Sequence, residues 1–176
     1  MNPLSLDMKD MPDSVPLFPL PNALLLPGSQ LPLNVFEPRY LAMIEDTLQT
    51  PERIIGMVQP LNEKGTLFNV GCAGRITYFQ ESGDGRYMIA LSGICRFTLQ
   101  AEQLTDRGYR RATVDWSRFA DDLKSSDEVI PERDKLITVM KRYFDVMNFD
   151  ADWTQIGQSG SEQIMNTLAS VCPFDV

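Results

Sequence analysis

Apolar and polar residues follow two different periods along the chain, and the change falls near residue 117. Before it, short apolar stretches separated by turn residues are typical of β-strands. The predicted strands cover residues 15–20, 23–26, 31–36, 53–59, 67–70, 75–80, 86–91, 94–99 and 109–116. One predicted helix interrupts them at residues 39–48, where Leu41, Ile44 and Leu48 recur at spacings of three and four. Many short strands with turns at close spacing predict a small, strongly bent sheet or barrel.

Two glycine-containing segments punctuate this pattern. Residues 81–85, with glycine at two of their five positions, predict a hairpin between the strands on either side. The Ser92–Gly93 pair predicts a break in the chain before the next strand.

The segment from Val15 to Leu33 forms an apolar arm that is rich in leucine and proline and contains no charged residue. Proline cannot donate a hydrogen bond to a sheet ladder, so residues 15–20 are predicted to form an edge strand or an extended arm. One reading is a strand at the margin of the core. The other is an exposed edge or groove that accepts extended polypeptide segments by β-augmentation.

Beyond residue 130 the period becomes helical. Residues 117–130 are acidic and polar and are predicted to be a linker, and Pro131 fits the first turn of the helix that follows. Its apolar face comprises Leu136, Ile137, Met140, Tyr143, Phe144 and Met147. Asp152 predicts a capped short helix, and a last helix is predicted to end at Cys172–Pro173. We therefore expect a flexible tail over residues 1–12, a β domain over 13–118, and a linker with a helical subdomain over 119–176.

Composition narrows the class of protein. The 176 residues suffice for one domain with a helical appendage, and the apolar content of 43% is ordinary for a chain with a real core. No apolar stretch approaches the roughly 20 residues needed to span a bilayer, and no secretory signal is visible at the N-terminus. We therefore expect no membrane association. The three widely spaced cysteines fit a reduced, cytoplasmic chain.

The net charge of −8 disfavours general nucleic-acid binding, because an acidic surface repels phosphates. Arg107, Arg110 and Arg111 form the one dense basic group, which we interpret as a solvated face.

The chain contains no histidine, which removes Ser-His-Asp and Cys-His catalysis and histidine-ligated zinc. The glycine pairs at 71/74 and 83/85 lack the lysine and the following helix of a phosphate-binding loop. No carboxylate pair stands out as an acid and base, and no cluster has metal-ligand spacing. We therefore expect no enzyme activity, no catalytic residue, no metal and no cofactor.

Three charged residues are nevertheless candidates for a site. Glu37 and Arg39 flank Pro38 at a strand-to-helix corner, and Arg96 lies in a predicted strand. They either line a cleft or hold the structure, with Arg39 donating to backbone carbonyls at the corner. The structural reading predicts that Arg39→Ala lowers the free energy of unfolding by about 1–3 kcal/mol.

Several ordered sequence blocks resemble the N-terminal, substrate-recognition domain family of Lon proteases. The blocks are residues 15–20 (VPLFPL), 26–28 (LPG), 31–40 (LPLNVFEPRY), 55–58 (IGMV), 70–76 (VGCAGRI) and 93–97 (GICRF). The resemblance implies an α+β fold, namely a PUA-like six-stranded pseudo-β-barrel with a short helix, followed by a small helical subdomain. It also implies recognition of unfolded or damaged protein. Because the helical part of the family usually continues further, this subdomain is expected to be truncated at its C-terminal end.

The resulting hypothesis is a non-enzymatic, cytoplasmic polypeptide-binding module that acts as an adaptor in protein quality control, with a protease or chaperone as partner. The candidate contact residues are Leu17, Phe18, Leu20, Leu24, Leu26, Leu31 and Leu33. The alternatives are an RNA-binding PUA-like module, which the charge argues against, and a small-ligand-binding or enzymatic domain.

Overall fold

A computed structural model describes residues 7–62, 65–124 and 133–171 of the chain. It divides into two units, Met1–Lys124 and Ser125–Val176. The strands of the first unit are β1 (Ser14–Pro19), β2 (Gln30–Val35), β3 (Ile54–Val58), β4 (Val70–Glu81), β5 (Tyr87–Leu104) and β6 (Arg110–Asp115). Its helices are the 3₁₀ turn η1 (Met8–Asp10), α1 (Pro38–Leu48) and the 3₁₀ segment η2 (Ser117–Leu123). The second unit contains α2 (Arg133–Met147), α3 (Trp153–Gln158) and α4 (Ser161–Val171).

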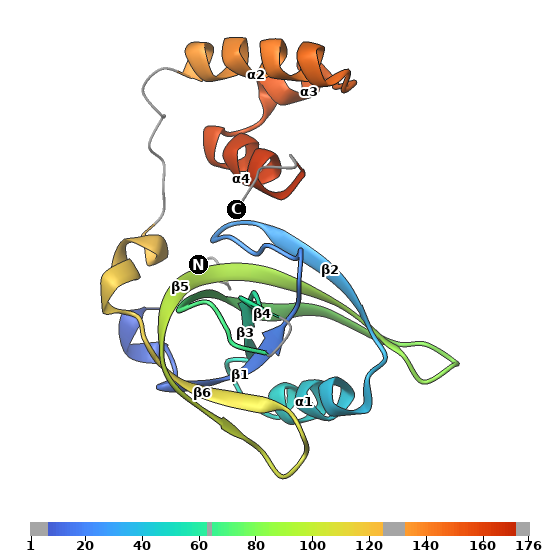
Figure 1. The fold of residues 1–176 in the computed structure, drawn as a ribbon, viewed down its shortest axis with the longest axis vertical. Coiled ribbons are helices and arrows are strands. Elements are labelled where there is room, and N and C mark those ends of the chain that lie inside the picture. The colour runs from blue at the N-terminus through green and yellow to red at the C-terminus, as the bar shows by residue number, and fades with distance from the viewer. Residues whose placement is uncertain (1–6, 63–64, 125–132, 172–176) are drawn as a thin grey trace. The chain divides into compact units, whose positions relative to one another are not determined.

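The six strands form one mixed sheet that curls back on itself (Figure 1). Their order is β2-β5-β4-β3-β1-β6, and a further pairing joins β6 to β5. The 18-residue strand β5 makes this closure possible, because its first part pairs with β2 and its last part with β6. The predicted α+β class and the strongly bent six-stranded sheet are thus confirmed.

The prediction that residues 15–20 form an edge strand is wrong. Strand β1 lies inside the sheet, antiparallel to β6 over residues 14–17 and parallel to β3 over residues 17–19. The strand changes partner at Leu17, and this change is what allows prolines in an interior strand.

Hydrogen-bond directions show why Pro16 is tolerated. The Val114 N–H donates to the Asp13 carbonyl at 3.1 Å, so odd-numbered residues of β1 direct their backbone groups toward β6. The nitrogen of Pro16 therefore faces the β3 side, where pairing begins only at Leu17.

The alternation of backbone groups along β1 also accommodates Pro19, whose nitrogen faces the β6 side. The Leu20 N–H donates to the Val58 carbonyl at 3.1 Å, so the nitrogen of Pro19 faces away from β3. On that side the pairing with β6 has already ended at Leu17. Neither proline occupies a position where a ladder hydrogen bond would be lost.

Two clusters of buried side chains fill the first unit. One surrounds Phe97 and includes Val15, Leu17 and Trp116, and the other packs α1 against the sheet. In the second cluster the Phe18 and Tyr40 rings lie 4.3 Å apart, which joins β1 to α1. Since β1 feeds both clusters, its residues 15–18 are all buried.

Three smaller predictions differ from the structure. Residues 23–26 form an irregular loop, and the first three residues of the predicted strand 67–70 precede β4. The chain does not break at Ser92–Gly93, because β5 continues through it with a register shift opposite Ala73/Gly74. The hairpin around residues 81–85 is present, with Gly85 at φ 79° in the turn.

Residues near both ends of the described part of the first unit contribute to its packing. Met11 is buried, and the Trp116 indole N–H donates to the Pro12 carbonyl at 3.0 Å. Residues 117–124, part of the predicted linker, belong to the first unit, and Phe119 in η2 is buried. The described part of residues 1–12 thus includes a core residue.

The second unit shows the predicted helical period. The side chain of Asp152 caps α3 by accepting from the Thr154 and Gln155 N–H groups at 3.0 and 3.1 Å, as predicted. The rings of Phe144, Phe149 and Trp153 meet edge to face. The predicted helix-opening residue, Pro131, and the predicted helix end at residues 172–173 lie outside the described residues.

Candidate functional site

The structure divides the apolar arm, residues 15–33, into buried and partly exposed leucines. Leu17 and Phe18 are core residues, with 0% and 5% of their surface exposed. Their side chains are therefore not available to a ligand. Leu20, Leu31 and Leu33 are partly exposed, and each packs against the α1 cluster.

Leu24 and Leu26 are also partly exposed, but they lie in a separate loop over β5. Backbone hydrogen bonds fix this loop: Gly28 N–H donates to Gly93 O at 3.0 Å, and Gly93 N–H donates to Ser29 O at 2.9 Å. The Ser29 hydroxyl donates to Leu26 O and accepts from Leu26 N–H. Leu24 and Leu26 therefore lie on backbone that is hydrogen-bonded to β5, while Leu25 between them is buried.

Strand β2 shows the alternation of a half-buried strand. Gln30, Pro32 and Asn34 are exposed, whereas Leu31 and Leu33 are half-buried. Because β2 stands first in the strand order and pairs only with β5 among the described strands, its other side is an edge of the sheet.

Glu37 and Arg39 lie together at the corner before α1. The Arg39 guanidinium donates to Glu37 Oε2 from Nε at 3.0 Å and from Nη2 at 2.8 Å, and it stacks on the Tyr40 ring at 4.5 Å. The side chains are 45% and 51% exposed. The Arg39 side chain bonds Glu37 and not the predicted backbone carbonyls, so we expect Arg39→Ala to cost less than about 1 kcal/mol.

Arg96 lies far from that corner in the sequence and holds η2 against β5. Its side chain binds both carboxylate oxygens of Asp122 at 2.9 and 2.6 Å, and its backbone N–H donates to the same carboxylate at 2.9 Å. The guanidinium also stacks on the Phe119 ring at 4.7 Å. Burial acts to raise the pKa of Asp122, but the hydrogen bonds from Arg96 outweigh it and lower that pKa. The bonds to Asp122 therefore give Arg96 a structural role.

We expect Asp122→Asn to lower the free energy of unfolding at pH 7 by about 1–3 kcal/mol. The Asp122 side chain is only 9% exposed, and the loss of its negative charge weakens three charge-assisted bonds from Arg96. Because the pKa of Asp122 is lowered in the folded state, its ionised carboxylate stabilises the fold at pH values above the unfolded-state pKa of about 3.9. This stabilisation is lost as pH falls through the folded-state pKa. The difference from wild type should therefore shrink below about pH 4.

Urea melts at pH 7 and pH 3 measure this difference. Glu37→Gln is the matched control, because it neutralises the carboxylate of an exposed arginine pair and should cost less than about 1 kcal/mol. Equal losses in the two variants would show that the Arg96–Asp122 pair has no special weight.

The basic group singled out in the sequence is already paired. Arg107 bonds the Glu45 and Asp46 carboxylates of α1, Arg110 donates to the Gly65 carbonyl and Glu102, and Arg111 donates to Ser14. These contacts neutralise or engage the guanidinium groups within the protein. The carboxylates that pair with Arg107 and Arg110 offset positive charge that a phosphate backbone would need.

The two described cysteines are unsuited to nucleophilic chemistry. Cys72 and Cys95 are both buried and free. Burial raises the pKa of the Cys72 thiol far above its usual range and that of Cys95 to about 12. A thiol with such a pKa is almost entirely protonated at neutral pH. Cys172 lies outside the described residues.

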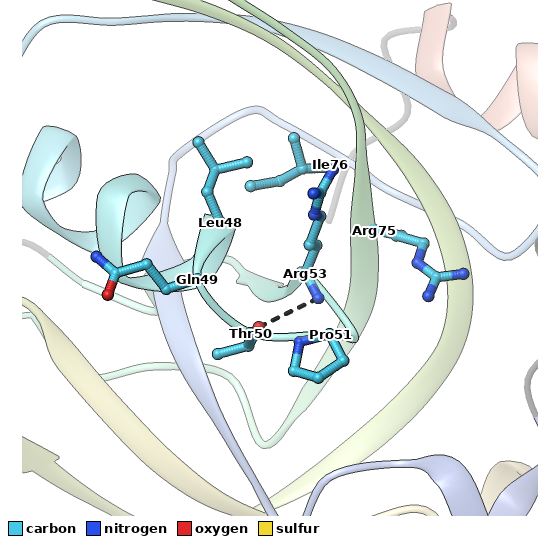
Figure 2. A pocket seen from close by; sticks show the side chains of 7 residues that line it. All are labelled: Leu48, Gln49, Thr50, Pro51, Arg53, Arg75 and Ile76. Carbon is cyan, nitrogen blue, oxygen red and sulfur yellow. Dashed lines mark hydrogen bonds between the residues drawn. The ribbon is translucent and has the colours of Figure 1, made fainter.

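Sequence reasoning missed an open groove at the C-terminal end of α1 (Figure 2). It has a volume of about 530 Å³ and is lined by Leu48, Gln49, Thr50, Pro51, Arg53, Arg75 and Ile76. Arg53 has a left-handed backbone, φ 52°, and its N–H donates to the Thr50 hydroxyl at 3.2 Å. In Figure 2 the guanidinium of Arg75 lies apart from that of Arg53, so the two do not form a clamp. No sequence signal marked this groove, because it is built by a turn and not by a motif.

The second unit contains an apolar cavity of about 320 Å³ that was also missed. Met140, Phe144, Ile156, Ile164 and Leu168 contribute to its lining. Among the residues described, no group of three or more acidic or cysteine side chains is placed to hold a metal ion. Of the described helices, none has the length and apolar character needed to cross a membrane.

Comparison with known proteins gives a consistent result. Residues 14–176 match the family model described as the ATP-dependent protease La (LON) substrate-binding domain. The chain is similar to a crystal structure of a Lon N-terminal domain protein from Xanthomonas campestris, with 30% identity, a TM-score of 0.65, and coverage of 92% of this chain and 84% of that one. The N-terminal domain of a Mycobacterium avium complex Lon protease shares the fold, with a TM-score of 0.64 at 14% identity over the same shares of the two chains.

Curated relatives are full proteases of which this chain matches one part. Lon protease 2 of Sorangium cellulosum is 31% identical over 109 residues, which is 58% of this chain and 13% of the relative. Lon protease 2 of Myxococcus xanthus is 28% identical over 130 residues, 70% of this chain and 15% of the relative. The chain therefore spans about one seventh of the length of these relatives.

Proposed function

Because the chain belongs to the family of the ATP-dependent protease La (Lon) substrate-binding domain, we propose that it is a non-enzymatic module that binds exposed apolar segments of unfolded or damaged polypeptides. Its place is in cytoplasmic protein quality control, as an adaptor that works with a protease or chaperone. The family that the chain matches is named for substrate binding, which supports a binding role.

The observation that carries this proposal is the uncharged surface of the arm and β2. No charged residue occurs between Asp13 and Glu37, although 23% of the chain is charged. Within that stretch Leu20, Leu31 and Leu33 are partly exposed over one core cluster. Apolar side chains that are partly open to solvent favour a partner that buries its own apolar side chains against them.

The module is expected to bind a permanently unfolded protein with a dissociation constant of about a micromolar or weaker, because a flexible client loses conformational entropy on binding. The affinity should change little between low and high salt, since apolar burial is not screened. Fluorescence anisotropy with carboxymethylated, fluorescein-labelled lactalbumin measures both quantities. Leu33→Asp should weaken binding about tenfold, whereas Leu104→Asp, at a 72% exposed leucine outside the arm, should leave it unchanged.

A structured RNA titrated under the same conditions tests the rival function. RNA affinity that falls steeply with salt and exceeds the polypeptide affinity would contradict the proposal. So would NMR shifts confined to Arg107–Arg111 on addition of unfolded protein.

A further inference from the structure

We propose that the free edge of β2 is the site that captures a client, by pairing with a short extended polypeptide segment as an added strand. This inference rests on the proposed function and specifies its binding mode. The edge itself indicates the chemistry of the client. It should be an uncharged segment in extended conformation, with apolar side chains at alternate positions.

The hydrogen bond from Gly93 N–H to Ser29 O fixes which backbone groups of β2 face outward. The carbonyl of Ser29 faces β5, so Leu31, Leu33 and Val35 also direct their backbone groups to β5. Gln30, Pro32 and Asn34 therefore direct theirs to the free edge. Within the described chain no hydrogen bond engages these outward groups.

The edge offers two N–H donors, from Gln30 and Asn34, because Pro32 has none. Three carbonyls, one from each of these residues, are available as acceptors. The two donors are separated by about 13 Å at the rise of an extended chain. The edge therefore fits a segment of about five residues and binds it weakly, while Pro32 limits the uncontrolled strand pairing that a fully open edge invites.

The two faces of β2 specify the alternate side chains of the client. Leu31 and Leu33 are half-buried on the inner face, so an added strand would continue their layer with its own apolar side chains. Gln30 and Asn34 are exposed on the outer face, where the client would place polar side chains. A segment with a period of two, as in a strand exposed by unfolding, matches both faces.

Three substitutions separate backbone pairing from side-chain contact. Asn34→Pro removes one outward donor without touching a bond to β5 and should weaken binding of carboxymethylated lactalbumin five- to tenfold. Pro32→Ala adds a donor and should tighten binding two- to fivefold. Asn34→Ala keeps the N–H and removes only the side-chain amide, so it should weaken binding less than Asn34→Pro does. Thermal melts and sedimentation of each variant accompany the anisotropy titrations.

The results distinguish failure of the proposed function from failure of the edge inference. If the wild-type chain binds no unfolded protein, the proposed function itself fails. If wild type binds and folded Asn34→Pro binds equally well, the edge inference alone is overturned. Should Asn34→Pro not fold, an unchanged affinity of Pro32→Ala overturns it. A wild-type dimer that Asn34→Pro abolishes would identify the edge as a self-interface and also overturn the inference.

Discussion

The Gly93→Ala variant is expected to lose about 3 kcal/mol or more of its free energy of unfolding. A Cβ at this position would lie 1.9 Å from the Leu26 carbonyl oxygen and 2.7 Å from its carbon. Both are backbone atoms of a loop that Gly93 itself holds through two hydrogen bonds. The added methyl group must therefore displace the loop or β5.

Urea unfolding measures the loss, and NMR shifts of Leu24 and Leu26 report whether the loop has left β5. Gly83→Ala is the matched control, because nothing lies within 4 Å of a Cβ there and its stability should change by less than about 1 kcal/mol. A Gly93→Ala midpoint equal to that of the control would show that the loop yields at no cost.

Phe97→Ala is expected to cost about 3–5 kcal/mol. Phe97 is fully buried and meets the Trp116 ring edge to face at 5.6 Å. Its ring also fits against Gly56 and Gly71, where added Cβ atoms would lie 3.0 and 2.4 Å from Cζ. Alanine would therefore leave a cavity bordered by two residues that have no side chain to fill it.

A double-mutant cycle with Gly56→Ala tests this geometry in the same urea assay. The closest atoms to a Cβ at Gly56 belong to Val15, Phe97 and Leu17 side chains, so removing the Phe97 ring should make Gly56→Ala less costly. Leu104→Ala, at an exposed leucine of the same strand, should cost less than about 0.5 kcal/mol. If the stability losses of Gly56→Ala and Phe97→Ala were strictly additive in the double mutant, the proposed packing would be contradicted.

The sequence pattern identified most strands and the first helix closely, because a period of two or 3.6 records which side chains are buried. It did not identify strand neighbours. The prolines of β1 suggested an edge, since the pattern does not report the direction of each backbone N–H. Only the partner change at Leu17 explains them. The Ser92–Gly93 pair likewise predicts a break, because the reason for a glycine there is the close approach of Leu26, which comes from a distant segment.

The candidate site was predicted in part by the same logic. The partly exposed Leu31 and Leu33 alternate with polar residues, which is the signature of a half-buried strand. Leu17 and Phe18 lie in an uninterrupted buried run, and such a run is typical of a strand covered on both faces. The half-buried pattern alone therefore indicates Leu31 and Leu33 as surface candidates and excludes Leu17 and Phe18.

The pairing of β1 with β6 has a consequence for folding during synthesis. These strands lie near opposite ends of the first unit, so the barrel closes only after almost all of that unit has left the ribosome. Until then β1 is an apolar strand without one of its partners, and closing so long a loop slows folding. The nascent chain thus passes through a stage in which it resembles the exposed polypeptides that the finished module is proposed to bind.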